Sequence, residues 1–294
     1  MARDDHIEIF QRIRAAYADL SPSFRKIADF LLESYRDAAF LAASRVASRA
    51  DVSESAVVRF AGAIGYSGYP EMLRAIQRIV KSELAPSRRL AGDGAEDRRD
   101  RRDVLGRTVA TDIENLRRTA SDPLTLASFD RAVAMLADAS EVYSLGLRRL
   151  GSLASMFGAL LGTSGVRTQV LTHGHAEMFE QLYYIKKEHV LVAFAFQRYT
   201  KRTVDAIDLA NRRGAGSLVI TDSLTSPAAQ SGRVSLICSV KGESFFNSYV
   251  AAVSVINALT TAVVDLRRKA TRRALDELDA LLPDEDFFGR GTDV

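Results

Sequence analysis

The feature that most constrains the fold is an alternation of short β-rich runs with helical stretches after about residue 104. Apolar residues with helical spacing fill most of the intervals between the runs, at 151–161, 176–185 and 201–213. The runs themselves span residues 141–145, 167–171, 189–196, 217–221 and 234–240. This order predicts a largely parallel sheet covered by helices on both faces. A long helix is expected next, at about 245–270, with Ser244 as its N-cap.

The first 84 residues show only helical patterns. Ser21 and Pro22 occupy the N-cap and first position of an expected helix, whose apolar stripe includes Phe24, Ile27 and Leu31. The predicted fold class is therefore α + α/β. It combines an N-terminal all-α domain with a C-terminal α/β/α domain built on a mostly parallel sheet.

Residues 44–69 have the pattern of a helix-turn-helix. Ser44 is expected to cap a short helix over 45–50, and Ser53 a second helix that ends near residue 64. In the second helix Val57, Phe60, Ala61 and Ile64 share one face, which is predicted to be buried. The opposite face is short and polar, with one arginine, so it could enter a major groove. From the spacing alone, an ordinary helical hairpin with a polar face fits equally well.

The residues expected to contact DNA lie on the exposed side of this segment and just beyond it. Arg59 is the strongest candidate for a base or phosphate contact, and the N-cap Ser53 suits a phosphate. The full set is Ser44, Arg45, Ser53, Glu54, Ser55, Val58, Arg59, Tyr66, Ser67 and Tyr69. Residues 44–81 hold six basic and three acidic side chains, an excess that permits DNA binding without identifying it.

Composition limits the compartment and the joint between the domains. The single cysteine, Cys238, excludes an intrachain disulfide, and neither a signal peptide nor a membrane span is evident, so we expect a cytoplasmic protein. Between 85 and 105, Pro86, glycines and alternating charges predict a solvated linker or the exposed start of a helix, with a basic DNA-binding arm as the alternative. The expected domains are 1–84 and 106–284, with a tail at 285–294.

Two groups of motifs resemble a known family. The sequence DVSESAVVRF at 51–60, followed by IGYSGYPE at 64–71, is similar to the RpiR/MurR family of transcriptional regulators. The second half resembles the sugar isomerase (SIS) domain of that family at YSLG (143–146), ANRRGA (210–215) and ITDS (220–223). The resemblance spans about residues 5–280. It implies operator DNA and self-assembly into dimers or tetramers as partners, a SIS domain that binds phosphorylated sugars, and regulation of nearby metabolic operons, mostly by repression.

The sequence departs from that family where a phosphate would bind. SIS domains commonly carry a Ser-x-Ser-Gly-x-Thr loop after the third strand, whereas residues 195–203 read AFQRYTKRT. Two arginine-bearing loops, near Arg148 and Arg198, are instead expected to converge on one small anionic metabolite, of which a sugar phosphate is an example. Surface or dimer-interface arginines are the alternative. The expected ligand residues are Gly146, Leu147, Arg148, Arg149, Ser152, Gln197, Arg198, Tyr199, Thr200, Thr203, Thr221 and Asp222.

Other functions fit the sequence less well. A sugar-phosphate isomerase would need a base beside the substrate and a firm phosphate cradle, and it would leave the first 84 residues without a role. A SIS domain that serves only as an oligomerisation scaffold is a third reading. His173 and His175 are too few for a metal site, and one of them could instead contact the ligand. We therefore expect no catalytic residues, no metal and no cofactor.

Overall fold

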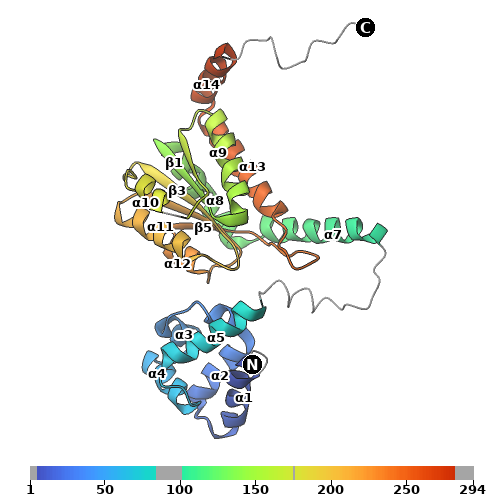
Figure 1. Cartoon of the computed structure of the whole chain (residues 1–294), viewed down its shortest axis with the longest axis vertical. Helices are drawn as coiled ribbons and strands as arrows, with labels where there is room; N and C mark the ends of the chain where they lie inside the picture. Colours follow the sequence, from blue (N-terminus) through green and yellow to red (C-terminus); the bar gives the residue numbers. More distant parts are fainter. Residues whose placement is uncertain (1–4, 84–100, 175, 282–294) are drawn as a thin grey trace. The chain divides into compact units, whose positions relative to one another are not determined.

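The computed structural model describes residues 5–83, 101–174 and 176–281, and it separates into two compact units (Figure 1). Most of the expected linker, the expected tail and His175 lie outside the described residues. The domain boundaries at 84 and 106 stay predictions. Residues 101–105 form the first turns of a helix, which agrees with the predicted alternative that this segment includes the exposed start of a helix.

The N-terminal unit is entirely helical in its described part. Ser21 is the N-cap of α2, where its hydroxyl accepts a hydrogen bond from the Phe24 backbone N–H at 3.4 Å, and Pro22 is the first helical residue. Phe24 and Phe60 meet edge to face, 5.7 Å between ring centroids, within a core formed by all five α-helices. The elements are α1 (Asp5–Ala16), η1 (Tyr17–Asp19), α2 (Pro22–Ala38), α3 (Ala43–Arg49), α4 (Glu54–Ala63) and α5 (Tyr69–Glu83).

The C-terminal unit contains a five-stranded sheet in the order β2-β1-β3-β4-β5. Every pair of neighbouring strands is parallel, which confirms the predicted sheet. The strands are β1 (Glu141–Gly146), β2 (Thr168–Leu171), β3 (His189–Ala195), β4 (Gly216–Thr221) and β5 (Val234–Ile237). The helical elements are α7 (Arg101–Ala120), α8 (Pro123–Asp138), η2 (Arg148–Leu150), α9 (Gly151–Thr163), α10 (Ala176–Leu182), α11 (Lys201–Arg212), α12 (Pro227–Ser231), α13 (Val250–Leu266) and α14 (Arg268–Leu281).

Helices cover both faces of the sheet, as the sequence predicts. Alternate residues of a strand point to opposite faces. Val190, Val192 and Phe194 therefore pack with α8, α9 and α13, whereas Leu191 and Ala193 pack with α10, α11 and α12. Two hydrophobic layers thus hold the sheet, and its polar chemistry is left to the loops at the strand ends.

Two expected helix starts are wrong. The helix expected at 245–270 is two helices, α13 and α14, that break at Arg267, and the N-cap of α13 is Tyr249 rather than Ser244. The hydroxyl of Ser248 accepts from the Val250 backbone N–H and donates to Asp112, which holds the preceding residues in a non-helical path. Likewise α3 begins two residues earlier than expected, at Ala43, so Ser44 lies inside the helix and does not cap it.

None of the described helices is by itself long and apolar enough to span a membrane. Only α13 and α14 together reach the necessary length and hydropathy, and the chain bends by 100° between them.

We predict that Gly146→Ala destabilises the C-terminal unit. A Cβ atom at this residue would lie 2.1 Å from the carbonyl oxygen of Leu150, so the turn between β1 and α9 would have to move. Overpacking of this kind costs about 1–3 kcal/mol of unfolding free energy. The measurement is chemical denaturation of the full chain. Gly162→Ala is the control, because nothing lies within 4 Å of its added Cβ; equal stability of the two variants would contradict the prediction.

Candidate functional site

A tight turn connects α3 to α4, as in a helix-turn-helix. Val46 and Ala47 of α3 are buried in the core of the N-terminal unit. Asp51 has a left-handed backbone with φ of 53°, and the Val52 N–H donates to the Ala47 carbonyl at 2.9 Å. The ammonium of Lys26 bonds the Asp51 carboxylate at 2.6 Å. The sharp reversal therefore rests on a residue type that tolerates this conformation.

The exposed face of helix α4 is the one that the sequence pattern predicts. Ser53 is its N-cap, and the Ser53 hydroxyl accepts from the Ala56 N–H at 3.2 Å. Val57 and Phe60 are fully buried, whereas Val58 keeps 47% of its surface exposed and Arg59 is also exposed. Glu54, Ser55, Arg45 and Ser44 are exposed as well. The helix thus presents short side chains and one guanidinium to solvent, a surface that can fit a major groove.

The segment after α4 is partly engaged within the unit. Both the backbone N–H and the hydroxyl of Ser67 donate to the Glu71 carboxylate at 2.7 Å, and these bonds lower the pKa of Glu71. The Arg12 guanidinium lies 4.9 Å from the centroid of the half-buried Tyr66 ring and donates to the Gly65 carbonyl at 2.8 Å. Ser67 is exposed and Tyr66 is half-buried, so DNA contact by these two residues stays a prediction.

The prediction that Tyr69 contacts DNA is wrong. Its side chain is buried, and its hydroxyl donates to the Leu41 carbonyl at 2.7 Å. Burial raises the pKa of Tyr69 to about 12. Tyr69 is the first residue of α5, so its hydrogen bond joins α5 to the segment between α2 and α3.

The second candidate site lies where the direction of the sheet order reverses. The strands β1 and β3 are neighbours, with Gly146 opposite Phe194, although β2 separates them in the sequence. Successive connections leave this point toward opposite edges of the sheet. Open parallel α/β sheets bind ligands in the crevice beyond the carboxyl ends of the strands at such a point. The two arginine-bearing loops selected from the sequence begin at this edge.

Both central arginines of these loops have a left-handed backbone. Arg148 has φ of 60° and Arg198 has φ of 70°, and both side chains are exposed. Among the described residues, Asp51 is the other non-glycine residue with positive φ. This conformation is uncommon for such residues and concentrates at functional sites. In this protein it marks the helix-turn-helix turn and the two loops at the sheet edge.

Asp222 ties the loop after β3 to the end of β4. Its carboxylate accepts from the Tyr199 hydroxyl at 2.7 Å and from the Gln197 N–H at 3.2 Å. Burial raises the pKa of Asp222, although these hydrogen bonds act in the opposite direction. The loop after β3, with the exposed Gln197 and the half-buried Tyr199 and Thr200, is thus bonded to the end of β4.

Other residues of the expected ligand set play supporting roles. Leu147, Thr203 and Thr221 are buried, and Thr203 shares a hydrogen bond with the Thr200 hydroxyl at 2.7 Å. Direct ligand contact by these three side chains does not fit the structure, because they pack beneath the loops. The absent side chain of Gly146 makes room for η2. Ser152 is exposed, and its hydroxyl donates to the Arg149 carbonyl at 2.9 Å.

The structure adds two residues to this edge that the sequence analysis missed. Gly174, after β2, lies against Leu147 and the Arg202 side chain, which brings a third loop and the start of α11 to the site. Tyr249 lies beside Arg149, and burial raises the pKa of its hydroxyl although Arg149 lowers it. No local pattern could have found Tyr249, because it is distant from Arg149 in the sequence.

Metal and thiol chemistry find no support at this edge. Within the described ranges, no group of three or more His, Cys, Asp or Glu side chains could hold a metal ion. Cys238 is fully buried, and burial raises the pKa of its thiol to about 12. The thiol therefore behaves as a packing group, as expected from its apolar surroundings.

Comparison with known proteins matches each unit to a known domain family. Residues 7–83 match the helix-turn-helix domain of the rpiR family, and residues 135–262 match the SIS domain. An HTH-type transcriptional regulator of uncharacterised function from Caldanaerobacter subterraneus is 25% identical over 284 residues, covering 94% of this chain and 97% of the relative.

Solved structures agree with this assignment. The sugar isomerase domain of an RpiR transcription factor from Sphaerobacter thermophilus is 26% identical, with a TM-score of 0.58, covering 60% of this chain and 99% of that one. The Vibrio vulnificus NanR protein complexed with ManNAc-6P is 18% identical, with a TM-score of 0.65, over 93% of this chain and 97% of NanR. The second likeness shows the same fold over both units.

We predict that Arg59→Ala weakens binding to the operator and leaves the thermal stability unchanged. The guanidinium is exposed on α4 and supports no described packing, so its loss should cost about 1–3 kcal/mol of binding free energy and relax sequence preference. Fluorescence anisotropy on DNA selected by the wild-type protein measures both effects. Arg273→Ala, which removes an exposed arginine from α14, is the control and should bind normally. Unchanged affinity and selectivity of Arg59→Ala would place Arg59 outside the groove.

We also predict a pH dependence that Asp222 controls. Its raised native pKa means that the folded chain holds this proton more tightly than the unfolded chain does. The resulting stabilisation is complete below the ordinary value of 3.8 and is lost as pH rises through the native pKa. Asp222→Asn removes this titration. Unfolding free energies of both proteins across that pH range should therefore diverge in slope, and parallel profiles would show that Asp222 does not carry the effect.

Proposed function

The chain belongs to the RpiR family of helix-turn-helix transcription regulators with a C-terminal SIS domain, and from this premise we propose how each unit works. The N-terminal unit binds double-stranded operator DNA through α4. The C-terminal unit binds a small anionic metabolite at the crevice between the ends of β1 and β3. Binding of the metabolite changes the affinity for DNA. The observation that carries the proposal is a pair of exposed arginines with a left-handed backbone, Arg148 and Arg198, in the loops that follow the neighbouring strands β1 and β3.

The DNA-binding half of the proposal rests on the exposed surface of α3 and α4. Ser53, Ser55 and Arg59 supply the hydroxyl and guanidinium donors that contact phosphates and base edges. A single short helix reads few base pairs, so two copies of the chain on a two-fold symmetric operator are part of the proposal. The protein then acts in the cytoplasm, where operator DNA lies, and the family resemblance favours repression.

A sugar phosphate is the proposed class of metabolite. The similar NanR protein is solved with ManNAc-6P, and the two proteins share their fold. In this chain Lys201 and Arg202 occupy the first turn of α11, where cations oppose the helix dipole. An anion bound at this turn would offset that repulsion. Arginines add paired donors that match phosphate or carboxylate geometry, which replaces the missing hydroxyl-rich loop.

The isomerase reading has less support. Asp222 is the one carboxylate in the expected ligand set, and its oxygens already accept from Tyr199 and Gln197. A catalytic base would have to reach the substrate instead. The relative that matches 94% of this chain is itself named as a transcriptional regulator rather than as an enzyme. A SIS domain that serves only as an oligomerisation scaffold would differ from the proposal in one measurable respect, since it would gain no stability from a metabolite.

We predict that a sugar phosphate raises the melting temperature of the full chain, and that the matching unphosphorylated sugar does not. A ligand at a hundred times its dissociation constant stabilises the folded state by about 2.7 kcal/mol. Arg148→Asn and Arg198→Asn should lose most of this gain, because asparagine tolerates the left-handed backbone and removes only the guanidinium. Thermal shift with a metabolite panel, followed by calorimetry, measures it.

The control for this experiment is Arg167→Asn. Arg167 is exposed and pairs with Glu141 at the opposite edge of the sheet, so it should respond like wild type. Stabilisation of both loop variants as strong as that of wild type would move the ligand to another site. Absence of any stabilisation across the panel would favour the scaffold reading.

A further inference from the structure

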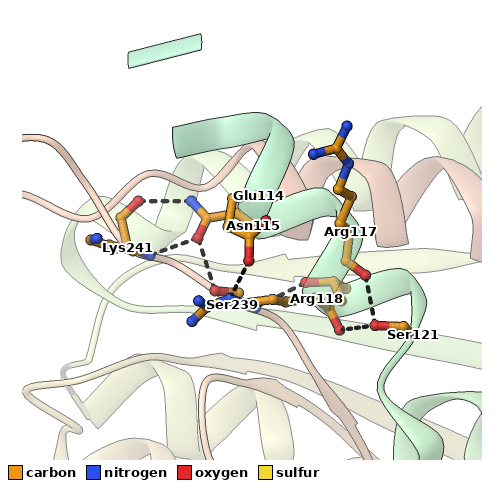
Figure 2. A network of polar contacts seen from close by, with 8 residues as sticks. Glu114, Asn115, Arg117, Arg118, Ser121, Ser239 and Lys241 are labelled. Atoms are coloured by element: carbon orange, nitrogen blue, oxygen red, sulfur yellow. Dashed lines mark hydrogen bonds and ion pairs between the residues drawn. The ribbon is translucent and has the colours of Figure 1, made fainter. Parts of the chain in front are cut away.

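A hydrogen-bond network fixes one face of α7 to the chain segment that follows β5 (Figure 2). The Asn115 side chain donates to the Lys241 carbonyl at 2.7 Å and accepts from the Ser239 hydroxyl at 2.8 Å. The Thr119 hydroxyl accepts from the Ser239 N–H at 2.9 Å. Asn115 and Thr119 are both buried. The orientation of α7 about its own axis is therefore set.

Another face of α7 is apolar and exposed. Leu105 keeps 73% of its surface accessible, Val109 47% and Ile113 41%. These residues are spaced four apart, so they form one stripe along the helix. Gly106 is exposed beside the stripe, where a helical glycine costs about 1 kcal/mol relative to alanine. A closely packed neighbour would account for both features, since it would cover the stripe and use the missing side chain.

We propose that the stripe of Leu105, Val109 and Ile113 packs against the same stripe of a second copy of this chain, with the two α7 helices antiparallel. The stripe is symmetric about Val109, so a two-fold axis there places Val109 against the partner's Val109. It also places Leu105 against the partner's Ile113. Such self-complementarity is what an interface between identical copies requires, because each contact must occur twice.

The charges beside the stripe agree with this arrangement. Asp103 and Arg117 are exposed and lie about four turns apart, on the same flank of α7. In an antiparallel pair, equivalent flanks face each other. The pairing through Val109 brings Arg117 within one turn of the partner's Asp103, and the symmetry repeats this contact. In Figure 2 the Arg117 guanidinium points away from the network that anchors the helix.

The location of this surface connects it to the sheet edge. The Cys238 N–H donates to the Thr221 carbonyl at 2.7 Å, beside Asp222, and the next residue, Ser239, bonds Asn115 of α7. A short covalent and hydrogen-bonded path thus runs from the end of β4 to the helix. Any rearrangement of the sheet edge that moves Ser239 would move α7 as well.

The first experiment measures the mass of the full chain in solution. We expect the wild type to form dimers or multiples of dimers, and Val109→Glu to raise the dissociation constant by roughly a hundredfold or more, because two carboxylates would be buried together. Tyr184→Glu is the matched control, since Tyr184 is 68% exposed on the same unit. An unchanged mass for Val109→Glu, or equal dissociation of the control, would overturn the proposal.

The second experiment tests the pairing by oxidation to a disulfide. The native thiol is buried, so only an introduced cysteine reacts. Val109→Cys should cross-link two chains. Leu105→Cys alone should not, because the two copies of residue 105 would lie about 12 Å apart along the helices, beyond the ~7 Å limit between bridged Cα atoms. The double variant Leu105→Cys with Ile113→Cys should cross-link.

Efficient cross-linking of Leu105→Cys alone would show a parallel pair, and no cross-linking of Val109→Cys would remove the stripe from the interface. Either result overturns the proposal. Neither experiment uses DNA or a metabolite, so its outcome is independent of the proposed function.

Discussion

The parallel pairing of β1 with β3 is the constraint on which the C-terminal unit depends. Because β2 lies on the other side of β1, the connections diverge at this pair, which is where open parallel sheets bind ligands. Helices on both faces bury the sheet, so the chemistry of the unit is confined to its edges. The loops that begin at Gly146 and Phe196 hold arginines in a conformation that most residues avoid, and hydrogen bonds to Asp222 hold the second loop in place. The topology therefore places two exposed arginines, Arg148 and Arg198, at the carboxyl ends of neighbouring strands.

Much of this could be predicted from the sequence, because periodicity reports burial directly. The five strands, the exposed face of α4 and the Ser53 cap all follow from local patterns and are confirmed. The errors arise where tertiary contacts override local signals. The sequence pattern predicts a surface position for Tyr69, but its hydroxyl donates to the Leu41 carbonyl inside the unit. The pattern also predicts Ser244 as an N-cap, but a hydrogen bond from Ser248 to Asp112 of α7 keeps this segment out of the helix. Contacts between residues far apart in the sequence, such as Arg149 and Tyr249, produce no periodic pattern in the sequence.

The two candidate sites belong to separate units, and α7 bears on how they communicate. This helix follows the part of the chain that leads from the N-terminal unit, and it is bonded to the segment after β5. A metabolite can change DNA affinity only if it favours one arrangement of the assembly over another. An interface on α7 would supply such an arrangement, since it joins two copies next to the path from the sheet edge.

A metabolite can regulate DNA binding only if the two units are thermodynamically coupled, and linkage measures this coupling directly. The measurement is the dissociation constant of a stabilising sugar phosphate, taken by calorimetry with and without the operator fragment selected by the protein. If the units are coupled, DNA changes this constant by a definite factor, and the metabolite changes DNA affinity by the same factor, as reciprocity requires. A metabolite that binds with equal affinity in the presence and absence of operator DNA would contradict the coupling.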